Sequence, residues 1–187
     1  MVVRRHPRTG ERHLDLLQWG LLPYRTKDPR KAARPINARS ETIATFGLFR
    51  GAFQARRCIV PADAFYEWQT TEAGKQPFAI TRQDGQPIAF AGLWESFRWP
   101  DGKITRSFVI ATTNANLDVA ALHDRMPVIL EPGDWPTWLG DVSGDPASLL
   151  RPSSEGTLRA WPISRRVNTP RNNSADLLQP IDLGAPC

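Results

Sequence analysis

The sequence contains few of the residues that crosslink a chain or bind metals. Only two of its 187 residues are cysteine, Cys58 and Cys187, and only three are histidine, His6, His13 and His123. Two cysteines form no disulfide framework, so we expect a reducing, cytoplasmic environment. The histidines are scattered, and neither cysteine has a neighbour at ligand spacing. We therefore expect neither a metal site nor a cofactor.

Long apolar runs and familiar catalytic motifs are absent as well. No stretch approaches the roughly 18 consecutive apolar residues of a membrane-spanning helix. The opening residues MVVRRHPRTG hold no apolar core of a secretory signal. The sequence also lacks GxSxG, GxxxxGK[ST], HExxH and GxGxxG, the motifs of common hydrolase, phosphate-binding, zinc-peptidase and dinucleotide sites. We expect no membrane partner and none of these site types.

Composition and length are those of an ordinary globular domain, but the charge is unevenly spread. Hydrophobic residues make up 41% and charged residues 23% of the chain. Residues 1–57 carry 13 Lys and Arg against 4 Asp and Glu, whereas the remainder carries 11 against 15. A basic segment of this kind attracts a polyanion such as a nucleic acid. The alternative is a solvated basic surface, and charge alone does not decide between the two.

Short runs rich in Val, Ile, Phe and Trp predict strands at residues 13–20, 57–61, 77–81, 88–94, 107–112 and 126–130. Asp84-Gly85 and Asp101-Gly102 indicate hairpin turns, and residues 7–10 indicate a turn that pairs the first strand with residues 13–19. Helices are expected at residues 40–46, capped by Ser40, and at 117–122 and 133–139.

Many strands and few short helices predict an α+β fold with a curved, mostly antiparallel sheet or open barrel. We expect residues 1–187 to form a single compact domain. The polar, proline-rich residues 165–187 are expected to wrap its surface as a tail.

Three polar sites stand beside apolar segments. Asn37 and Arg39 lie in RPINARSET, where the amide could orient a reacting group and the guanidinium could hold a phosphate. The alternative, which the pattern alone favours, is a helix cap and a surface salt bridge.

Glu67 and His123 are candidates for proton transfer. Glu67 lies between Tyr66 and Trp68, where desolvation would raise the carboxyl pKa toward neutral pH. It could equally face outward from an alternating strand. His123 precedes a predicted strand and adjoins Asp124, so it could act as an acid or base, although a lone histidine is more often structural.

Together these segments resemble the SOS response-associated peptidase (SRAP) family. The segments INARSET, CIVPADAFYEW, KQPFAI, AGLWE and LHDRMPVIL occur in the family's order, and WGLLP and PISRRVNTPRNN extend the resemblance over nearly the whole chain. The resemblance implies a compact α+β domain with a basic cleft for single-stranded DNA, near a bacterial nucleoid when bound. It also implies a protein of the DNA damage response that crosslinks to abasic sites. The peptidase activity in the family's name is the removal of the protein's own initiator Met.

The resemblance also implies roles for individual residues. Asn37 would position the nucleophile, and Glu67 and His123 would move protons during ring opening and imine formation. Phosphates would be held by Arg39 and Arg125. Tyr24, next to Arg25, would stack on bases. Trp19 is expected mainly in the core, with base stacking as its alternative role.

The sequence departs from the family at its start. Family members use an N-terminal cysteine, whose α-amine and thiol close a ring on the sugar aldehyde, but residue 2 here is Val. We expect Met1 to match an internal family position, because of a misplaced start codon, a cut chain or a truncated relative. The chain with that upstream segment is expected to be more stable.

Cys58 lies in an apolar strand and is expected to be inert. Enzymatic activity of this chain is therefore left open. The alternatives are a monomeric module that binds single-stranded or abasic DNA without a covalent bond, and a non-catalytic remnant.

Overall fold

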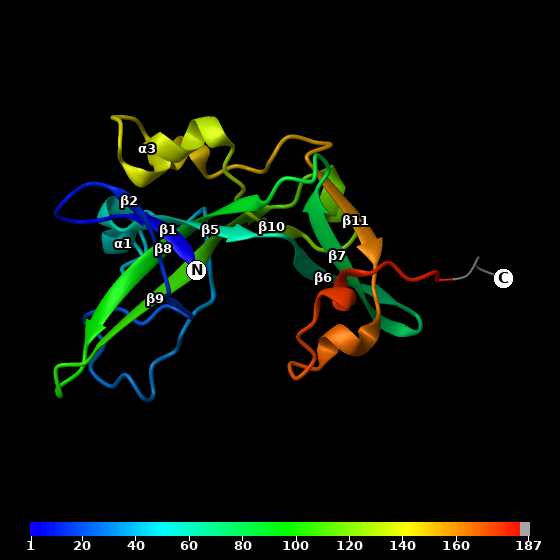
Figure 1. Ribbon diagram of the computed structural model, residues 1–187, viewed down its shortest axis with the longest axis horizontal. Helices are drawn as coiled ribbons and strands as arrows, with labels where there is room; N and C mark the ends of the chain where they lie inside the picture. Colours follow the sequence, from blue (N-terminus) through cyan, green and yellow to red (C-terminus); the bar gives the residue numbers. More distant parts are fainter. Residues whose placement is uncertain (184–187) are drawn as a thin grey trace. The chain divides into compact units, whose positions relative to one another are not determined.

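The computed structural model describes residues 1–183 and divides into two compact units (Figure 1). The first unit comprises Met1–Pro61, Ala89–Thr113 and Pro127–Ser153, and the second comprises Ala62–Ile88, Asn114–Met126 and the residues from Ser154 onward. No helix among the described residues has both the length and the apolar character to cross a bilayer.

The strands are β1 (Val2–Arg5), β2 (Arg12–Asp15), β3 (Gln18–Trp19), β4 (Asn37–Arg39), β5 (Arg57–Ala62), β6 (Phe65–Thr71), β7 (Gly74–Arg82), β8 (Ile88–Arg98), β9 (Ile104–Asn114), β10 (Arg125–Pro127) and β11 (Leu158–Pro162). The α-helices are α1 (Arg50–Ala55), α2 (Leu117–Ala120) and α3 (Trp135–Leu139). The 3-10 helices are η1 (Pro132–Asp134), η2 (Pro146–Leu149), η3 (Arg165–Asn168) and η4 (Ala175–Leu178).

The larger sheet has eight strands in the order β10-β9-β8-β5-β1-β2, and β3 and β4 also pair with β9. The β1–β2, β1–β5 and β8–β9 pairs are antiparallel, whereas β3 and β4 run parallel to β9. The path ends at β10 and β2, so this sheet stays open. The expected α+β fold, with a mostly antiparallel sheet and few short helices, is confirmed.

The hairpin of β8 and β9 forms the centre of this sheet (Figure 1). Arg98 pairs with Ile104 across the predicted Asp101-Gly102 turn, where Gly102 has a φ of +86° that favours glycine. The turn predicted at residues 7–10 also forms, and it joins β1 to β2. Both hairpins are local, which is why turn residues and alternating patterns reveal them.

The core of the first unit lies on one face of this sheet. Leu93 and Val109 pair across β8 and β9 and point into a buried cluster that includes Phe53 of α1 and Trp138 of α3. The indole Nε1 of Trp138 donates to the backbone oxygen of Cys58 at 2.8 Å. Burial of these large side chains stabilises the packing of both helices on the sheet.

Arg57 fastens α1 to α3 inside the first unit. Its guanidinium donates to the backbone oxygens of Phe53 at 2.6 Å and Gln54 at 3.0 Å, and also to that of Trp138. Burial lowers the pKa of Arg57. The side chain satisfies carbonyls at the end of α1 that have no partner within the helix.

The second unit contains a three-stranded sheet in the order β11-β7-β6. Residues following β11 pack back on it: Trp161 Nε1 donates to the Leu178 oxygen at 2.7 Å, and Ile181 N donates to the Pro162 oxygen at 3.0 Å. The expected tail extends to residue 187, and its last four residues, including Cys187, lie outside the described residues.

Three local expectations were wrong. Residues 40–46 form turns rather than a helix, and the first helix begins at Arg50, because β-branched residues and Gly47 weaken helical propensity in between. Asp84-Gly85 forms a turn, but the strands on either side, β7 and β8, belong to different sheets. Residues 13–20 form two short strands with different partners, β1 and β9.

Replacing Arg57 with Ala is expected to lower the free energy of unfolding by about 3 kcal/mol, since three carbonyls lose a charged donor. Urea unfolding measures the change. Arg50→Ala is the matched control, because Arg50 is an exposed α1 arginine without a side-chain hydrogen bond in residues 1–183. Equal losses in the two variants would contradict the structural role of Arg57.

Candidate nucleic-acid interface

Three of the predicted site residues form a row on the first unit. They belong to β3 and β4, which run parallel to β9 and pair with alternate residues of it. The pairs are Trp19 with Phe108, Asn37 with Ile110 and Arg39 with Thr112. Because alternate residues of a strand point to the same face, the three side chains share one face of the sheet.

This face is opposite the core. Ala38 lies between Asn37 and Arg39, pairs with Ala111 and is 1% exposed within the buried cluster. The alternation of the strand therefore turns Asn37 and Arg39 away from the core, and both are exposed. Trp19, Asn37 and Arg39 are called the β4 row below.

Asn37 and Arg39 are available to a ligand. Within residues 1–183, neither side chain makes a hydrogen bond or an ion pair. The alternative explanation, a helix cap and a surface salt bridge, finds no support, because no helix starts at Ser40. A free guanidinium beside a free amide can bind a phosphate and orient a polar group.

Trp19 is not a core residue, contrary to the main expectation. Its side chain is 52% exposed, and its ring stacks on Phe108 with 6.4 Å between centroids and an angle of 10°. The indole Nε1 donates to the Ile36 oxygen at 3.0 Å. Phe108 and this hydrogen bond hold the indole against the sheet while half of its surface stays open for stacking.

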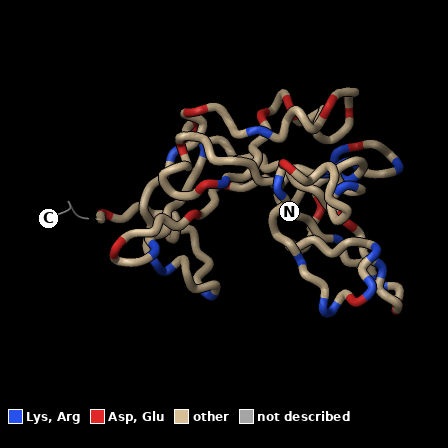
Figure 2. The backbone as a smooth tube through the Cα atoms, turned by 180° about the vertical axis from the view of Figure 1, so that it is seen from behind, with Lys and Arg blue, Asp and Glu red and all other residues tan. Residues whose placement is uncertain are grey.

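Tyr24 and Arg25 lie in the loop between β3 and β4, whose charged residues are all Lys or Arg except Asp28 (Figure 2). Tyr24 is 52% exposed, and the guanidinium carbons of Arg25 and Arg56 lie 5.2 and 5.7 Å from its ring centroid. The two cations hold the phenol ring by cation–π attraction. Sequence reasoning found Tyr24 and Arg25 but not Arg56, which is 32 residues away in the chain.

Glu67 and His123 lie in the second unit. Glu67 is on β6, and Gln69, two residues later on the same strand face, donates its Nε2 to the Ala121 oxygen at 3.3 Å. This bond ties β6 to the turn that follows α2. His123 continues the same turn, with its backbone N donating to the Val119 oxygen at 3.1 Å.

The environment of Glu67 raises its pKa. Burial of the carboxyl is the main cause and the Asp124 carboxylate adds to it, whereas charge on His123 lowers the pKa. The predicted desolvation of Glu67 is confirmed. A carboxyl with a raised pKa keeps its proton at higher pH and can donate it, which suits general acid catalysis.

His123 has two competing partners at Nδ1. The backbone N of Arg125 donates to Nδ1 at 2.9 Å, and Asp124 Oδ1 lies 3.0 Å from the same atom. The first contact requires a lone pair on Nδ1 and therefore a neutral ring; the second requires a proton there. Asp124 is 88% exposed, so water screens its attraction to Nδ1. For a neutral ring, the hydrogen bond from the Arg125 backbone is therefore stronger than the contact with Asp124. Both contacts use Nδ1, and Nε2 has no hydrogen bond within residues 1–183.

Arg125 is held by Asn114 in the second unit, its Nη1 donating to Asn114 Oδ1 at 2.8 Å. The backbone supports this contact, since Ala115 N donates to the Asp124 oxygen at 2.9 Å. Sequence reasoning missed Asn114 and Gln69, whose partners come from other segments. The short interval between Glu67 and Gln69 was the only available signal for the latter.

Metal-ligating side chains and the Cys58 thiol are the other groups that could carry chemistry. Residues 1–183 contain no group of three or more His, Cys, Asp and Glu side chains placed to hold a metal. Cys58 is fully buried, and burial raises the pKa of its thiol far above the ordinary value although Arg4 opposes the shift. The thiol stays protonated and unreactive, as its apolar strand predicted.

The stability of the Glu67→Gln variant relative to wild type is expected to increase as the pH rises. The folded-state pKa of Glu67 is raised, so ionisation above the unfolded-state value of about 4.3 lowers wild-type stability. Glutamine does not ionise and escapes this loss. Urea unfolding at pH 4 and pH 8 measures the difference in stability between variant and wild type. A difference independent of pH would contradict the raised pKa.

Comparison with known proteins adds relatives that share most of the chain. The abasic site processing protein YoqW of Bacillus subtilis is 39% identical over 170 residues, covering 89% of this chain and 76% of YoqW. The abasic site processing protein YedK of Escherichia coli is 37% identical over 174 residues, covering 90% of this chain and 76% of YedK.

A solved structure shares the fold. The crystal structure of a protein from Bacteroides thetaiotaomicron superposes with a TM-score of 0.85 at 26% identity, covering 96% of this chain and 80% of that protein. Residues 1–170 match the family described as SOS response associated peptidase. The chain therefore belongs to the SRAP family.

Proposed function

We propose that this chain binds single-stranded DNA and processes abasic sites in it, the family's route being a covalent bond to the opened sugar. The observation that carries the proposal is the β4 row, in which an exposed indole, a free amide and a free guanidinium share one sheet face. The relatives' names supply the substrate class, since YoqW and YedK are both named abasic site processing proteins. The basic residues 1–57 supply the attraction to a polyanion.

Each candidate residue has a role in this proposal. Trp19 and Tyr24 stack on bases, with Arg25 supporting Tyr24. Arg39 and Arg125 hold phosphates through charge-assisted hydrogen bonds. The amide of Asn37 orients the abasic sugar.

Proton transfer belongs to Glu67 and His123. Opening an abasic sugar to its aldehyde requires a proton to leave one oxygen and another to reach the ring oxygen. The raised pKa of Glu67 lets its carboxyl keep a proton to a higher pH than an ordinary glutamate and deliver it to the ring oxygen. Nε2 of His123 hydrogen-bonds to the sugar or its phosphate. The protein acts in this proposal as a cytoplasmic, nucleoid-associated monomer.

Non-covalent binding is the second candidate, and Cys58 favours it. Cys58 is the one cysteine among residues 1–183, and burial of its thiol raises the thiol pKa and keeps it from a DNA strand. Within this chain, the site would then bind an abasic strand without forming a bond to it.

A denaturing gel of the chain incubated with an abasic single-stranded oligonucleotide separates these candidates. We expect no shifted band, together with a shift on a native gel that is stronger for the abasic strand than for the intact one. A band that survives heating in denaturant would show a covalent adduct and a nucleophile other than Cys58. Absence of a shift on both the denaturing and the native gel would overturn the proposed function.

Arg39→Ala is expected to weaken binding to abasic and intact strands alike, by about fivefold at low salt, because it removes a phosphate contact. The slope of log affinity against log salt should shrink by about 0.7. Asn37→Ala should instead lower the preference for the abasic strand. Fluorescence anisotropy at several salt concentrations measures both effects, and Arg50→Ala serves as the control.

A further inference from the structure

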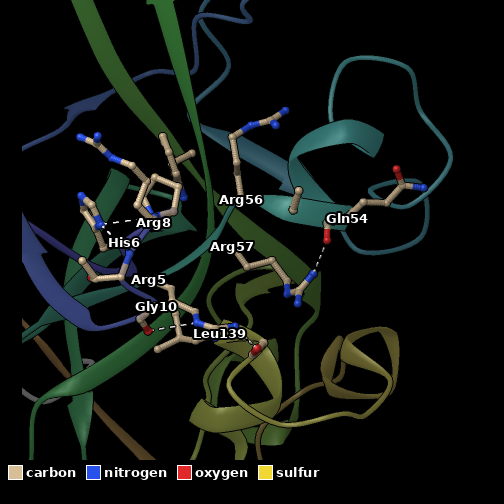
Figure 3. Close-up of a pocket in the computed structure, with 13 residues that line it drawn as sticks. Arg5, His6, Arg8, Gly10, Gln54, Arg56, Arg57 and Leu139 are labelled. Carbon is tan, nitrogen blue, oxygen red and sulfur yellow. Dashed lines mark hydrogen bonds between the residues drawn. The ribbon is translucent and has the colours of Figure 1, made fainter.

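A basic cavity of about 720 Å³ lies in the first unit, apart from the β4 row (Figure 3). Three segments line most of it: residues 5–10 at the turn between β1 and β2, residues 54–57 at the junction of α1 and β5, and the end of α3 at Leu139 and Gly140. Trp94 of β8 completes the lining. The volume falls in the range of roughly 300–1,000 Å³ that is typical of small-molecule sites.

The lining carries four arginines, Arg5, Arg8, Arg56 and Arg57, and no carboxylate. Two acidic residues outside the lining contact these arginines. Glu95 is 2.7 Å from the Arg56 guanidinium, and Asp141 is 3.6 Å from that of Arg5 but also binds Arg12 at 2.6 Å. Positive charge therefore exceeds negative charge, and a concave surface concentrates its field on an anion.

Two of the arginines are fixed by the protein itself. Arg57 donates to three backbone carbonyls, and Arg5 donates to the oxygens of Gly10 and Gly140. Their guanidinium groups are oriented by these bonds and add charge to the cavity. In residues 1–183, only the Nη2 group of each is left without a hydrogen bond.

The other two arginines have donors to spare. Arg56 uses one terminal nitrogen on Glu95, and its other terminal nitrogen makes no hydrogen bond in residues 1–183. Arg8 is exposed and has no side-chain partner in the same residues. A guanidinium offers paired donors that match the oxygens of a phosphate.

An aromatic surface adjoins the cavity. Tyr24 is not part of the cavity lining, but the guanidinium carbon of the lining residue Arg56 lies 5.7 Å from its ring centroid. Tyr24 is half-exposed, so a base can stack on it. A phosphate at Arg56 and a base at Tyr24 together make a nucleotide.

Two arginines that line the cavity, Arg5 and Arg57, are on the sheet face opposite the β4 row. Val3 pairs with Ile59, and both pack in the core cluster. Arg5 and Arg57, each two residues away on the same strands, share that core face. A phosphate bound beside these arginines therefore does not occupy the positions of Asn37 and Arg39, whereas the Tyr24 ring is shared between the two sites.

We propose that this cavity is a second ligand site, which binds the phosphate of a nucleotide through Arg8 and Arg56 with the base on Tyr24. The nucleotide is either free or part of a single strand. In the second case the site deepens the strand-binding half of the proposed function; it does not depend on the abasic chemistry.

Two substitutions test the site without disturbing the fold. Arg8→Ala removes a free donor, and Gln54→Glu places a carboxylate at the rim from an exposed side chain. Arg56 is unsuitable for substitution, because its loss would leave the buried Glu95 carboxylate without its ion-pair partner. Arg98→Ala is the control, an exposed arginine of β8 outside the cavity. Thermal unfolding verifies that all variants fold.

Calorimetry with thymidine 5′-monophosphate and anisotropy with an intact oligothymidylate measure binding at low salt. We expect Arg8→Ala and Gln54→Glu to weaken binding about fivefold, with a salt slope smaller by about 0.7 for the oligonucleotide in Arg8→Ala. Losses with the monophosphate alone identify a free nucleotide as the ligand, and losses with the oligonucleotide alone identify the strand backbone.

Wild-type affinity of both variants for both ligands would overturn the proposal. The ratio of abasic to intact binding distinguishes this site from the proposed function. It should stay unchanged in Arg8→Ala and fall in Asn37→Ala. An unchanged ratio in Asn37→Ala would count against the proposed function and leave the cavity site standing.

Discussion

The hydrogen-bond register between β4 and β9 is the constraint on which the candidate interface depends. Asn37 lies beside Ile110 and Arg39 beside Thr112, with Ala38 buried between them. A slip of one residue would place the amide and the guanidinium in the core and expose the alanine. The desolvation of a charged group makes that slip strongly unfavourable, so the core packing around Ala38 also fixes what the opposite face presents.

The sequence predicted those parts of the fold that are set by local interactions. Apolar runs and the Asp101-Gly102 turn revealed β8, β9 and their hairpin, because a tight turn and alternation need only neighbouring residues. The strands β4, β6 and β11 were not predicted as elements. The first is only three residues long and is stabilised by a partner more than 70 positions away, a pairing that local propensity cannot show.

The candidate site likewise has parts that the sequence predicted and parts that it did not. The resemblance to a family located Asn37, Arg39, Glu67 and His123 by motif, and Glu67 is partly buried as expected, although its neighbours Tyr66 and Trp68 point to the opposite face of β6. The basic cavity was not foreseen, because its arginines come from a hairpin, a helix end and a strand. Arg57 shows why counting charges is not enough. Its guanidinium is committed to backbone carbonyls, and only the structure separates such an arginine from one that is free.

Both compact units are discontinuous in the chain, which alternates between them from end to end. During synthesis, most of the second unit's sheet emerges before the last segment of the first, Pro127–Ser153, which includes α3 and Trp138. The core of the first unit therefore stays incomplete until Pro127–Ser153 has left the ribosomal exit tunnel, even when all earlier segments of that unit are already outside it. The hydrophobic face of its sheet stays uncovered until α3 packs on it. Folding of the two units therefore overlaps in time instead of proceeding one after the other.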